Sequence, residues 1–241
     1  MKAVHFGAGN VGRGFIGAVL QDSGYHVVFA DVNADVIDSL NSAGHYRVVE
    51  IGEGGTTSDY KNFSAINSML EPQRLRDELA TADLITAAVG VNILPRIAPA
   101  IAEAILLREL TTPVLVMACE NAVNATDLLA EEIAKYGVDQ SKVIFCNTAV
   151  DRIVPIQDAK LSPDVEVEVF SEWVIETKNL TTSLSIPAAK LVPDLEPFIE
   201  RKLYTVNTGH CAIAYLGQKA GQLTIATALR DPEIEREVAE V

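Results

Sequence analysis

The chain has 241 residues, of which 49% are hydrophobic, and its formal net charge at pH 7 is −14. This length suffices for one large domain, or one domain and part of another, while the negative charge argues against nucleic acid and anionic membranes as partners. No apolar run approaches the roughly 18 residues of a membrane span and no targeting signal precedes the first predicted strand, so we expect a cytoplasmic globular protein.

The first predicted elements form a strand, a glycine-rich turn and a helix. A short apolar strand, Ala3–Phe6, runs directly into Gly7-Ala-Gly-Asn-Val-Gly12, and a helix is predicted over Arg13–Leu20. The first glycine permits a tight turn, the second lets the backbone approach a diphosphate, and the third allows close packing of helix on strand. The phosphates would lie at the positive helix N-terminus. This pattern favours a dinucleotide-binding unit over a structural βαβ unit with accidental glycines.

A second strand, Tyr25–Ala30, ends at Asp31, 19 residues after Gly12. A carboxylate there accepts hydrogen bonds from the adenosine ribose and repels a 2′-phosphate, which favours NAD over NADP. A later strand within Ala82–Gly90 ends where the coenzyme's ribose and nicotinamide pass in this architecture. The candidate cofactor-binding residues are Phe6, Gly7, Ala8, Gly9, Asn10, Val11, Gly12, Arg13, Asp31, Val89 and Gly90.

The remaining N-terminal elements alternate between helices and apolar strands, apart from one irregular hairpin. Helices are expected at residues 33–41, 70–80, 93–109 and 125–136, strands at 113–119 and 142–146, and the hairpin at 48–61. This alternation predicts a Rossmann-like, doubly wound and mostly parallel sheet.

Two polar pairs follow predicted strands. Glu120 and Asn121 come after the strand 113–119, where a polar pair is better placed for a ligand than for the core. Alternatively, Asn121 caps the following helix. Asp151 and Arg152 form either a structural ion pair or a support for the active site, and we favour the structural role.

The central region is expected to extend the sheet. Residues 165–170 alternate strictly and 173–176 continue in the same style, which predicts an antiparallel extension with one solvated face. A linker over 187–197 leads into a helical segment. The predicted domains are therefore residues 1–190, which bind NAD, and 191–241, the beginning of an all-α domain. Three widely spaced cysteines predict buried, reduced thiols: Cys119, Cys146 and Cys211.

One lysine, one amide and one imidazole lie among apolar residues near the end of the chain: Lys202, Asn207 and His210. A lysine in apolar surroundings loses hydration, so its pKa falls towards the range of a base near pH 7. An amide can donate to an oxygen that gains charge, and an imidazole can orient it. The alternative is an ordinary amphipathic helix with a snorkelling lysine, a capping asparagine and a satisfied histidine.

The spacing of these residues limits how they can meet. On an α-helix, residues eight apart lie about 80° apart around the axis, so Lys202 and His210 can face one cleft. Asn207, five residues from the lysine, lies about 140° away. We therefore expect a π-type widening or a bend near Thr208–Gly209 that brings Asn207 round.

Over its whole length the chain resembles the polyol-specific long-chain dehydrogenase family. The resemblance rests on residues 2–17, 118–121, 149–155, 170–173 and 200–210, and the form Gly-Asn-Val-Gly-Arg-Gly points to the phosphate-using branch. It implies NAD-dependent interconversion of D-mannitol 1-phosphate and D-fructose 6-phosphate without zinc. Lys202 would be the general base, Asn207 and Asn121 would hold the reacting oxygen, and His210 would position the substrate.

Family members are longer, which implies that residues binding the sugar phosphate lie outside this chain and that an apolar face is uncovered at Ile213, Leu216 and Ile225. We expect a monomer or weak homo-oligomer. One alternative is a dehydrogenase or reductase of an unphosphorylated polyol or a hexuronate. The other is an NAD-binding module without turnover.

Overall fold

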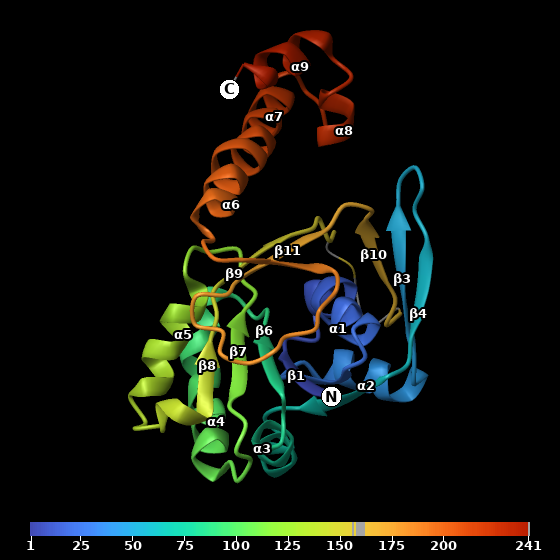
Figure 1. The fold of residues 1–241 in the computed structure, drawn as a ribbon. Helices are drawn as coiled ribbons and strands as arrows, with labels where there is room; N and C mark the ends of the chain where they lie inside the picture. Colours follow the sequence, from blue (N-terminus) through green and yellow to red (C-terminus); the bar gives the residue numbers. More distant parts are fainter. Residues whose placement is uncertain (156, 158–161, 241) are drawn as a thin grey trace. The chain divides into compact units, whose positions relative to one another are not determined.

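The computed structural model describes residues 1–155, 157 and 162–240, which form two compact units, Met1–Asp194 and Leu195–Val241 (Figure 1). The first unit contains a parallel sheet with helices, and the second is helical in all of its described regular structure. The predicted fold class, a Rossmann-like sheet followed by a helical segment, is confirmed. No described helix combines a bilayer-spanning length with a sufficiently apolar sequence.

A six-stranded sheet with the order β5-β2-β1-β6-β7-β8 forms the centre of the first unit, and all of its pairs are parallel. The strands are β1 (Lys2–Phe6), β2 (His26–Asp31), β5 (Phe63–Asn67), β6 (Leu84–Ala87), β7 (Val114–Ala118) and β8 (Val143–Phe145). The central strands are mostly apolar on both faces because each face is covered, which is typical of parallel sheets, and the buried polar exceptions are His5 and Thr86.

Successive side chains of β1 enter different cores, because side chains alternate across a strand. Ala3 packs in one core with Phe29 and Trp173, whereas Val4 packs in the other with Ile101. The second core is formed with α3 (Pro72–Ala80), α4 (Leu94–Leu107) and α5 (Ala125–Ala134), and α4 contacts both α3 and α5. The first contains residues from α1 (Ala18–Asp22) and α2 (Ala34–Ala43).

Local signals explain the bounds of α2. The side chain of Asn33 accepts a hydrogen bond from the backbone N–H of Asp35, which caps the helix start, and Gly44 ends the helix with φ +66°. An asparagine before a helix and a left-handed glycine after it are common start and stop residues. The predicted helix at 33–41 is thus present, although it continues to Ala43.

Two three-stranded sheets accompany the main sheet. One has the order β10-β3-β4 and the other β12-β11-β9. The strands are β3 (Tyr46–Ile51), β4 (Thr57–Tyr60), β9 (Thr148–Asp151), β10 (Val165–Glu168), β11 (Glu172–Glu176) and β12 (Ala189–Val192). The predicted hairpin at 48–61 is confirmed by the antiparallel β3–β4 pair.

The antiparallel extension expected over 165–170 and 173–176 is confirmed for 173–176 and wrong for 165–170. Strand β10 pairs parallel with β3, whereas β11 belongs to another sheet and pairs antiparallel with β9 and parallel with β12. Alternation reveals that one face of a strand is buried, but it does not identify the neighbouring strand. Strand β12 lies inside the predicted linker 187–197, and β5 lies in a region where the sequence patterns indicate no strand.

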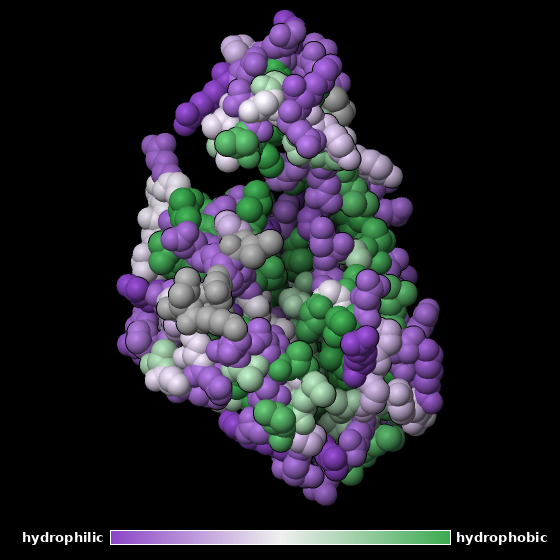
Figure 2. Space-filling model, turned by 180° about the vertical axis from the view of Figure 1, so that it is seen from behind, coloured by the Kyte–Doolittle hydropathy of each residue, from purple (hydrophilic) through white to green (hydrophobic). Residues whose placement is uncertain are grey.

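The second unit consists of α6 (Glu196–Arg201), a π-helix (Lys202–Asn207), α7 (Thr208–Lys219), α8 (Ile225–Ala228) and α9 (Pro232–Ala239). Its small core contains Ile213, Ala228 and Ile234, with Leu216 packed against them. The prediction of an uncovered apolar face is therefore wrong for Ile213, which the turn back through α8 and α9 buries. Ile225 is exposed, and Figure 2 shows hydrophobic surface over α8.

Candidate functional site

The glycine-rich turn after β1 is held by close backbone packing. Gly7 has φ +100°, and a Cβ atom there would lie 2.4 Å from the carbonyl oxygen of Ala88. A Cβ on Gly12 would lie 1.8 Å from the carbonyl oxygen of Gly7. Neither position therefore admits a side chain without movement of the backbone. The next turn of the helix is π-helical over Gly12–Gly17, in place of the regular α-helix that the sequence predicts.

Gly9 differs from these two glycines because its surroundings are open. No heavy atom lies within 4 Å of the position that a Cβ of Gly9 would take. Gly9 also lines a pocket at this edge of the sheet. The open space at Gly9 is where a ligand can approach the backbone closely, as the glycine spacing predicts.

Two polar side chains of the turn point into the protein. Arg13 is fully buried and donates hydrogen bonds to the carbonyl oxygens of Ala8 and Pro163 (3.0 Å for Pro163) and to Oδ1 of Asn10 (3.2 Å). Burial lowers the pKa of its guanidinium. Nδ2 of Asn10 donates to the carbonyl oxygen of Pro155 (3.2 Å). Arg13 and Asn10 therefore brace the turn from behind.

Asp31 joins the end of β2 to the glycine-rich turn. Its Oδ2 accepts a hydrogen bond from the backbone N–H of Ala8 (2.7 Å), and its Oδ1 accepts one from the backbone N–H of Asn33 (2.9 Å). The carboxylate is partly exposed and lines the same pocket as Gly9. Each oxygen of a carboxylate has a second acceptor site, so both can still receive a hydrogen bond from a ligand.

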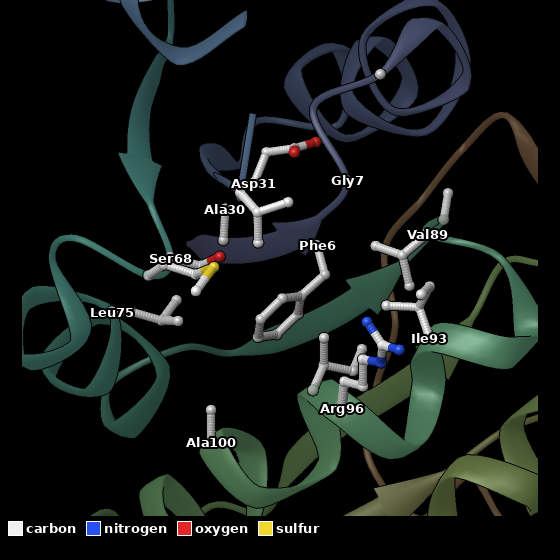
Figure 3. A pocket seen from close by; sticks show the side chains of 15 residues that line it. Phe6, Gly7, Ala30, Asp31, Ser68, Leu75, Val89, Ile93, Arg96 and Ala100 are labelled. Carbon is white, nitrogen blue, oxygen red and sulfur yellow. The ribbon is translucent and has the colours of Figure 1, made fainter. Parts of the chain in front are cut away.

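The pocket has a volume of about 650 Å³ and lies at the carboxyl ends of β1, β2 and β6 (Figure 3). Its lining contains five of the predicted cofactor-binding residues: Phe6, Gly7, Gly9, Asp31 and Val89. Sequence reasoning missed the remaining lining residues: Ala30, Val32, Ser68, Met69, Leu75, Ala88, Ile93, Arg96, Ile97 and Ala100. Ser68 directly follows β5, so recognition of that strand would have indicated it.

A buried carboxylate supports the turn after β6. Oε1 of Glu120 accepts hydrogen bonds from the backbone N–H groups of Val89 (2.8 Å) and Gly90 (3.0 Å). Burial raises the pKa of Glu120, and these two hydrogen bonds oppose that shift. Glu120 thus fixes the turn that the sequence assigns to the ribose and nicotinamide side of the coenzyme. The sequence alone gives Glu120 no definite role.

Asn121 is exposed, next to Glu120. The residue at the N-cap of α5 is Asn124, which has φ +53°. The alternative that Asn121 merely caps this helix is therefore wrong.

Arg152 has a structural role, as favoured, but its partner is not Asp151. Its Nη2 lies 2.7 Å from Oε1 of Glu50, and its side chain also donates to the carbonyl oxygens of Glu168 (3.0 Å) and Gly14 (3.3 Å). The guanidinium therefore ties β3, β10 and the helix after the glycine-rich turn together. Sequence adjacency suggested Asp151, but neighbouring residues in a strand point to opposite faces.

The candidate catalytic residues of the second unit lie on one continuous helical stretch. Lys202 and Asn207 are the first and last residues of the π-helix, and His210 is in the first turn of α7. All three side chains are half-buried. The widening predicted at Thr208–Gly209 thus occurs, but it begins at Lys202. Hydrogen bonds in a π-helix join residues five apart, which brings Asn207 onto the side of Lys202.

Thr208 marks the end of this widened turn. Its backbone N–H and its hydroxyl both donate to the carbonyl oxygen of Leu203, the hydroxyl at 2.8 Å. Within residues 1–155, 157 and 162–240, no cluster of three or more His, Cys, Asp and Glu side chains is arranged to hold a metal ion. The polar groups that this segment brings together are the amine of Lys202, the amide of Asn207 and the imidazole of His210.

The parallel sheet, the glycine-rich turn and the acidic residue that ends β2 define a Rossmann-fold dinucleotide-binding unit. The family described as the mannitol dehydrogenase Rossmann domain matches residues 1–187, and the mannitol dehydrogenase C-terminal domain matches residues 194–241. The chain belongs to the mannitol dehydrogenase family.

Curated relatives named mannitol-1-phosphate 5-dehydrogenase align along the chain. One from Pseudarthrobacter chlorophenolicus is 49% identical over 100% of this chain and 64% of its own length. One from Neurospora crassa is 48% identical over 98% of this chain and 63% of its own length. The chain thus spans slightly less than two thirds of the length of these relatives.

Solved structures show the same fold at low sequence identity. A mannitol 2-dehydrogenase from Pseudomonas fluorescens, solved as a ternary complex with NAD and D-mannitol, has a TM-score of 0.81 and 16% identity, covering 99% of this chain and 62% of its own. A ketopantoate reductase of the PanE/ApbA family from Ralstonia eutropha has a TM-score of 0.63 and 19% identity, covering 96% and 71%.

Proposed function

We propose that this chain comprises the coenzyme-binding domain and the catalytic helix of an NAD-dependent mannitol-1-phosphate 5-dehydrogenase, which interconverts D-mannitol 1-phosphate and D-fructose 6-phosphate. The observation that carries the proposal is the 49% identity to a relative of that name over the whole chain. This alignment spans both the glycine-rich turn and the Lys202 segment. Coenzyme and catalytic functions are therefore proposed together.

The residues around the pocket fit NAD. Open space at Gly9 leaves room for a diphosphate against the backbone, and the Asp31 carboxylate keeps acceptor sites for ribose hydroxyls. Its negative charge disfavours a 2′-phosphate, which supports NAD over NADP. When bound, the nicotinamide accepts a hydride from the alcohol or donates one to the ketone. The turn held by Glu120 would border this end of the coenzyme.

Lys202 is the proposed general base. It would take the proton of the substrate hydroxyl during alcohol oxidation and return it to the carbonyl oxygen in the reverse direction. The π-helix aligns Asn207 with Lys202, so the amide can donate to the same oxygen as its charge changes. Asn121 would add a second donor, and His210 would position the substrate. No zinc ion takes part in this proposed step.

The test is an absorbance assay of NADH consumption with fructose 6-phosphate. It uses the chain itself and the chain extended with the C-terminal remainder of the Pseudarthrobacter relative. Lys202→Ala should lower the turnover of the active form about 10²- to 10⁴-fold while NADH binding is retained. Lys219→Ala, at the end of the same helix, is the matched control and should leave turnover unchanged.

Product analysis separates the rival substrates. Activity restricted to free mannitol or to a hexuronate would contradict the phosphorylated substrate. NADH binding without turnover in either form, and unaffected by Lys202→Ala, would favour a non-catalytic NAD-binding module. Loss of activity on treatment with a zinc chelator would contradict the metal-free step.

We further propose a cytoplasmic location and a monomer or weak homo-oligomer that acts on a small-molecule sugar phosphate. Exposed apolar side chains at and beside α8, Leu223, Ile225 and Leu229, are the surface on which such self-association would occur. Sedimentation velocity over a range of concentrations tests this, because a tight dimer would not dissociate on dilution.

A further inference from the structure

Two arginines occupy the third position of helices that begin with a proline in the first turn: Arg74 in α3 and Arg96 in α4. The N-terminus of a helix carries partial positive charge, so a cation there is unfavourable unless it is neutralised. Nη1 of Arg74 is neutralised by Oε2 of Glu71 at 2.9 Å. The side chain of Arg96 is exposed, and no ion pair or hydrogen bond of it is found among residues 1–155, 157 and 162–240.

This difference does not follow from a shortage of acidic residues, because the chain has 33 Asp and Glu against 19 Lys and Arg. Arg96 is exposed, so water hydrates its guanidinium and the helix N-terminus repels it only weakly. What distinguishes Arg96 from Arg74 is its place, because Arg96 lines the pocket beside the glycine-rich turn, where a ligand can reach its guanidinium.

The surroundings of Arg96 indicate which ligand. Arg96 and Asp31 are the charged residues among those that line the pocket, and most of the remaining lining is apolar. In Figure 3, the guanidinium of Arg96 lies on the α4 side of the pocket beside Ile93, and Asp31 lies on the opposite side. A ligand that fits must be largely flat or apolar, must offer hydroxyls to Asp31, and must offer a π-face or negative charge to Arg96.

We propose that Arg96 binds the AMP half of the coenzyme, so that Asp31 and Arg96 hold this half from opposite sides of the pocket. An adenine ring presents a π-face on which a guanidinium stacks, and the adjacent phosphate accepts its charged hydrogen bonds. The inference rests on the proposed function, since it takes NAD as the ligand. It adds a cationic side chain to a wall of the pocket that α4 otherwise lines with the apolar residues Ile97 and Ala100.

The experiment measures Kd for NADH, AMP, adenosine and nicotinamide mononucleotide by calorimetry on wild type, Arg96→Ala and Arg74→Ala. Arg96→Ala should raise Kd for NADH and AMP about tenfold and leave Kd for nicotinamide mononucleotide unchanged. Arg74→Ala should leave all four values unchanged. Adenosine distinguishes the two contacts. If the guanidinium stacks on the base, Arg96→Ala weakens the binding of adenosine and AMP in parallel. If the guanidinium binds the phosphate, the binding of adenosine is unchanged.

Thermal unfolding without ligand supplies a readout that a merely structural arginine would not give. Arg96→Ala should not lower Tm, because it removes an unneutralised cation from a helix N-terminus, whereas Arg74→Ala should lower Tm slightly. Kd values for NADH and AMP that lie within twofold of wild type in Arg96→Ala would overturn the inference. Failure of the wild type to bind NADH would instead overturn the proposed coenzyme, and with it the premise of this inference.

Discussion

The two π-helical segments found in the described part of the chain use the same backbone geometry in opposite ways, Gly12–Gly17 being closed by packing and Lys202–Asn207 being open to solvent. Gly12–Gly17 is buried at every residue and rich in glycine, and side chains of Phe29 and Val165 fill the space beside it. Lys202–Asn207 has no buried residue and carries polar side chains. A widened helical turn can thus bring a backbone close to its surroundings, or it can align side chains that an α-helix would separate.

The largest expected effect comes from a substitution that disrupts the closed segment, Gly12–Gly17. Gly12→Ala would place a Cβ 1.8 Å from the carbonyl oxygen of Gly7, so the turn must distort. We expect a loss of about 3 kcal/mol or more in the free energy of unfolding, or failure to fold, as measured by urea denaturation. Gly209→Ala is the control beside the open segment, because no heavy atom lies within 4 Å of the position that its Cβ would take.

In Gly209→Ala the added methyl group contacts no atom outside its own helix, and alanine has a higher helix propensity than glycine. Gly209→Ala should therefore be neutral or stabilising by about 0.5 to 1 kcal/mol. Equal destabilisation by the two substitutions would show that the segments do not differ in packing.

A second, intermediate effect concerns the imidazole of His5, which lies beside Gly12 of the closed segment. His5 is fully buried, its Nδ1 lies 2.7 Å from Oγ1 of Thr86, and burial lowers its pKa from 6.5 to about 3. Between these pH values the unfolded chain binds a proton that the folded chain does not bind, so stability falls as pH falls. Between pH 6.5 and 5 this contribution amounts to roughly 2 kcal/mol.

His5→Gln should remove that contribution, because glutamine does not titrate. Urea denaturation at pH 6.5 and pH 5 checks it: the variant is less stable at pH 6.5 but loses less stability on acidification. The same pH dependence in wild type and variant would contradict a buried neutral imidazole.

The smallest expected effect on stability concerns the open segment. Thr208→Val removes the hydroxyl that donates to the carbonyl oxygen of Leu203 across the widened turn. We expect a stability loss of about 1 kcal/mol or less. Turnover with fructose 6-phosphate in the extended chain should fall more than stability implies, since Asn207 is no longer held beside Lys202.

Thr205→Val is the matched control for that variant, because its hydroxyl donates to the carbonyl oxygen of Arg201 one α-helical turn back. It should leave turnover nearly unchanged. If both threonine variants lose the same amount of turnover, the hydrogen bond across the widened turn has no specific role in catalysis and the prediction is contradicted.

The same contrast explains what the sequence could predict. The tight backbone packing at Gly7 and Gly12 was predictable because backbone sterics leave few alternatives there, whereas the π-helical form of Gly12–Gly17 was not. Arg96 was not, because only the folded chain shows that it lines the same pocket as Asp31. Strand β12 was missed because a short exposed strand carries no strong periodicity, and the widening at Lys202 was predicted in kind but not in position.

The three thiols differ in exposure, so a reagent can modify one of them selectively. Cys119 and Cys146 are buried, and burial raises the pKa of Cys119 well above its usual value and that of Cys146 to about 11. Cys211 is exposed on α7, contrary to the expectation of three buried cysteines, and directly follows His210. A maleimide dye should therefore attach at a single natural position, and its emission would report ligand binding near the proposed catalytic residue His210 without any engineered residue.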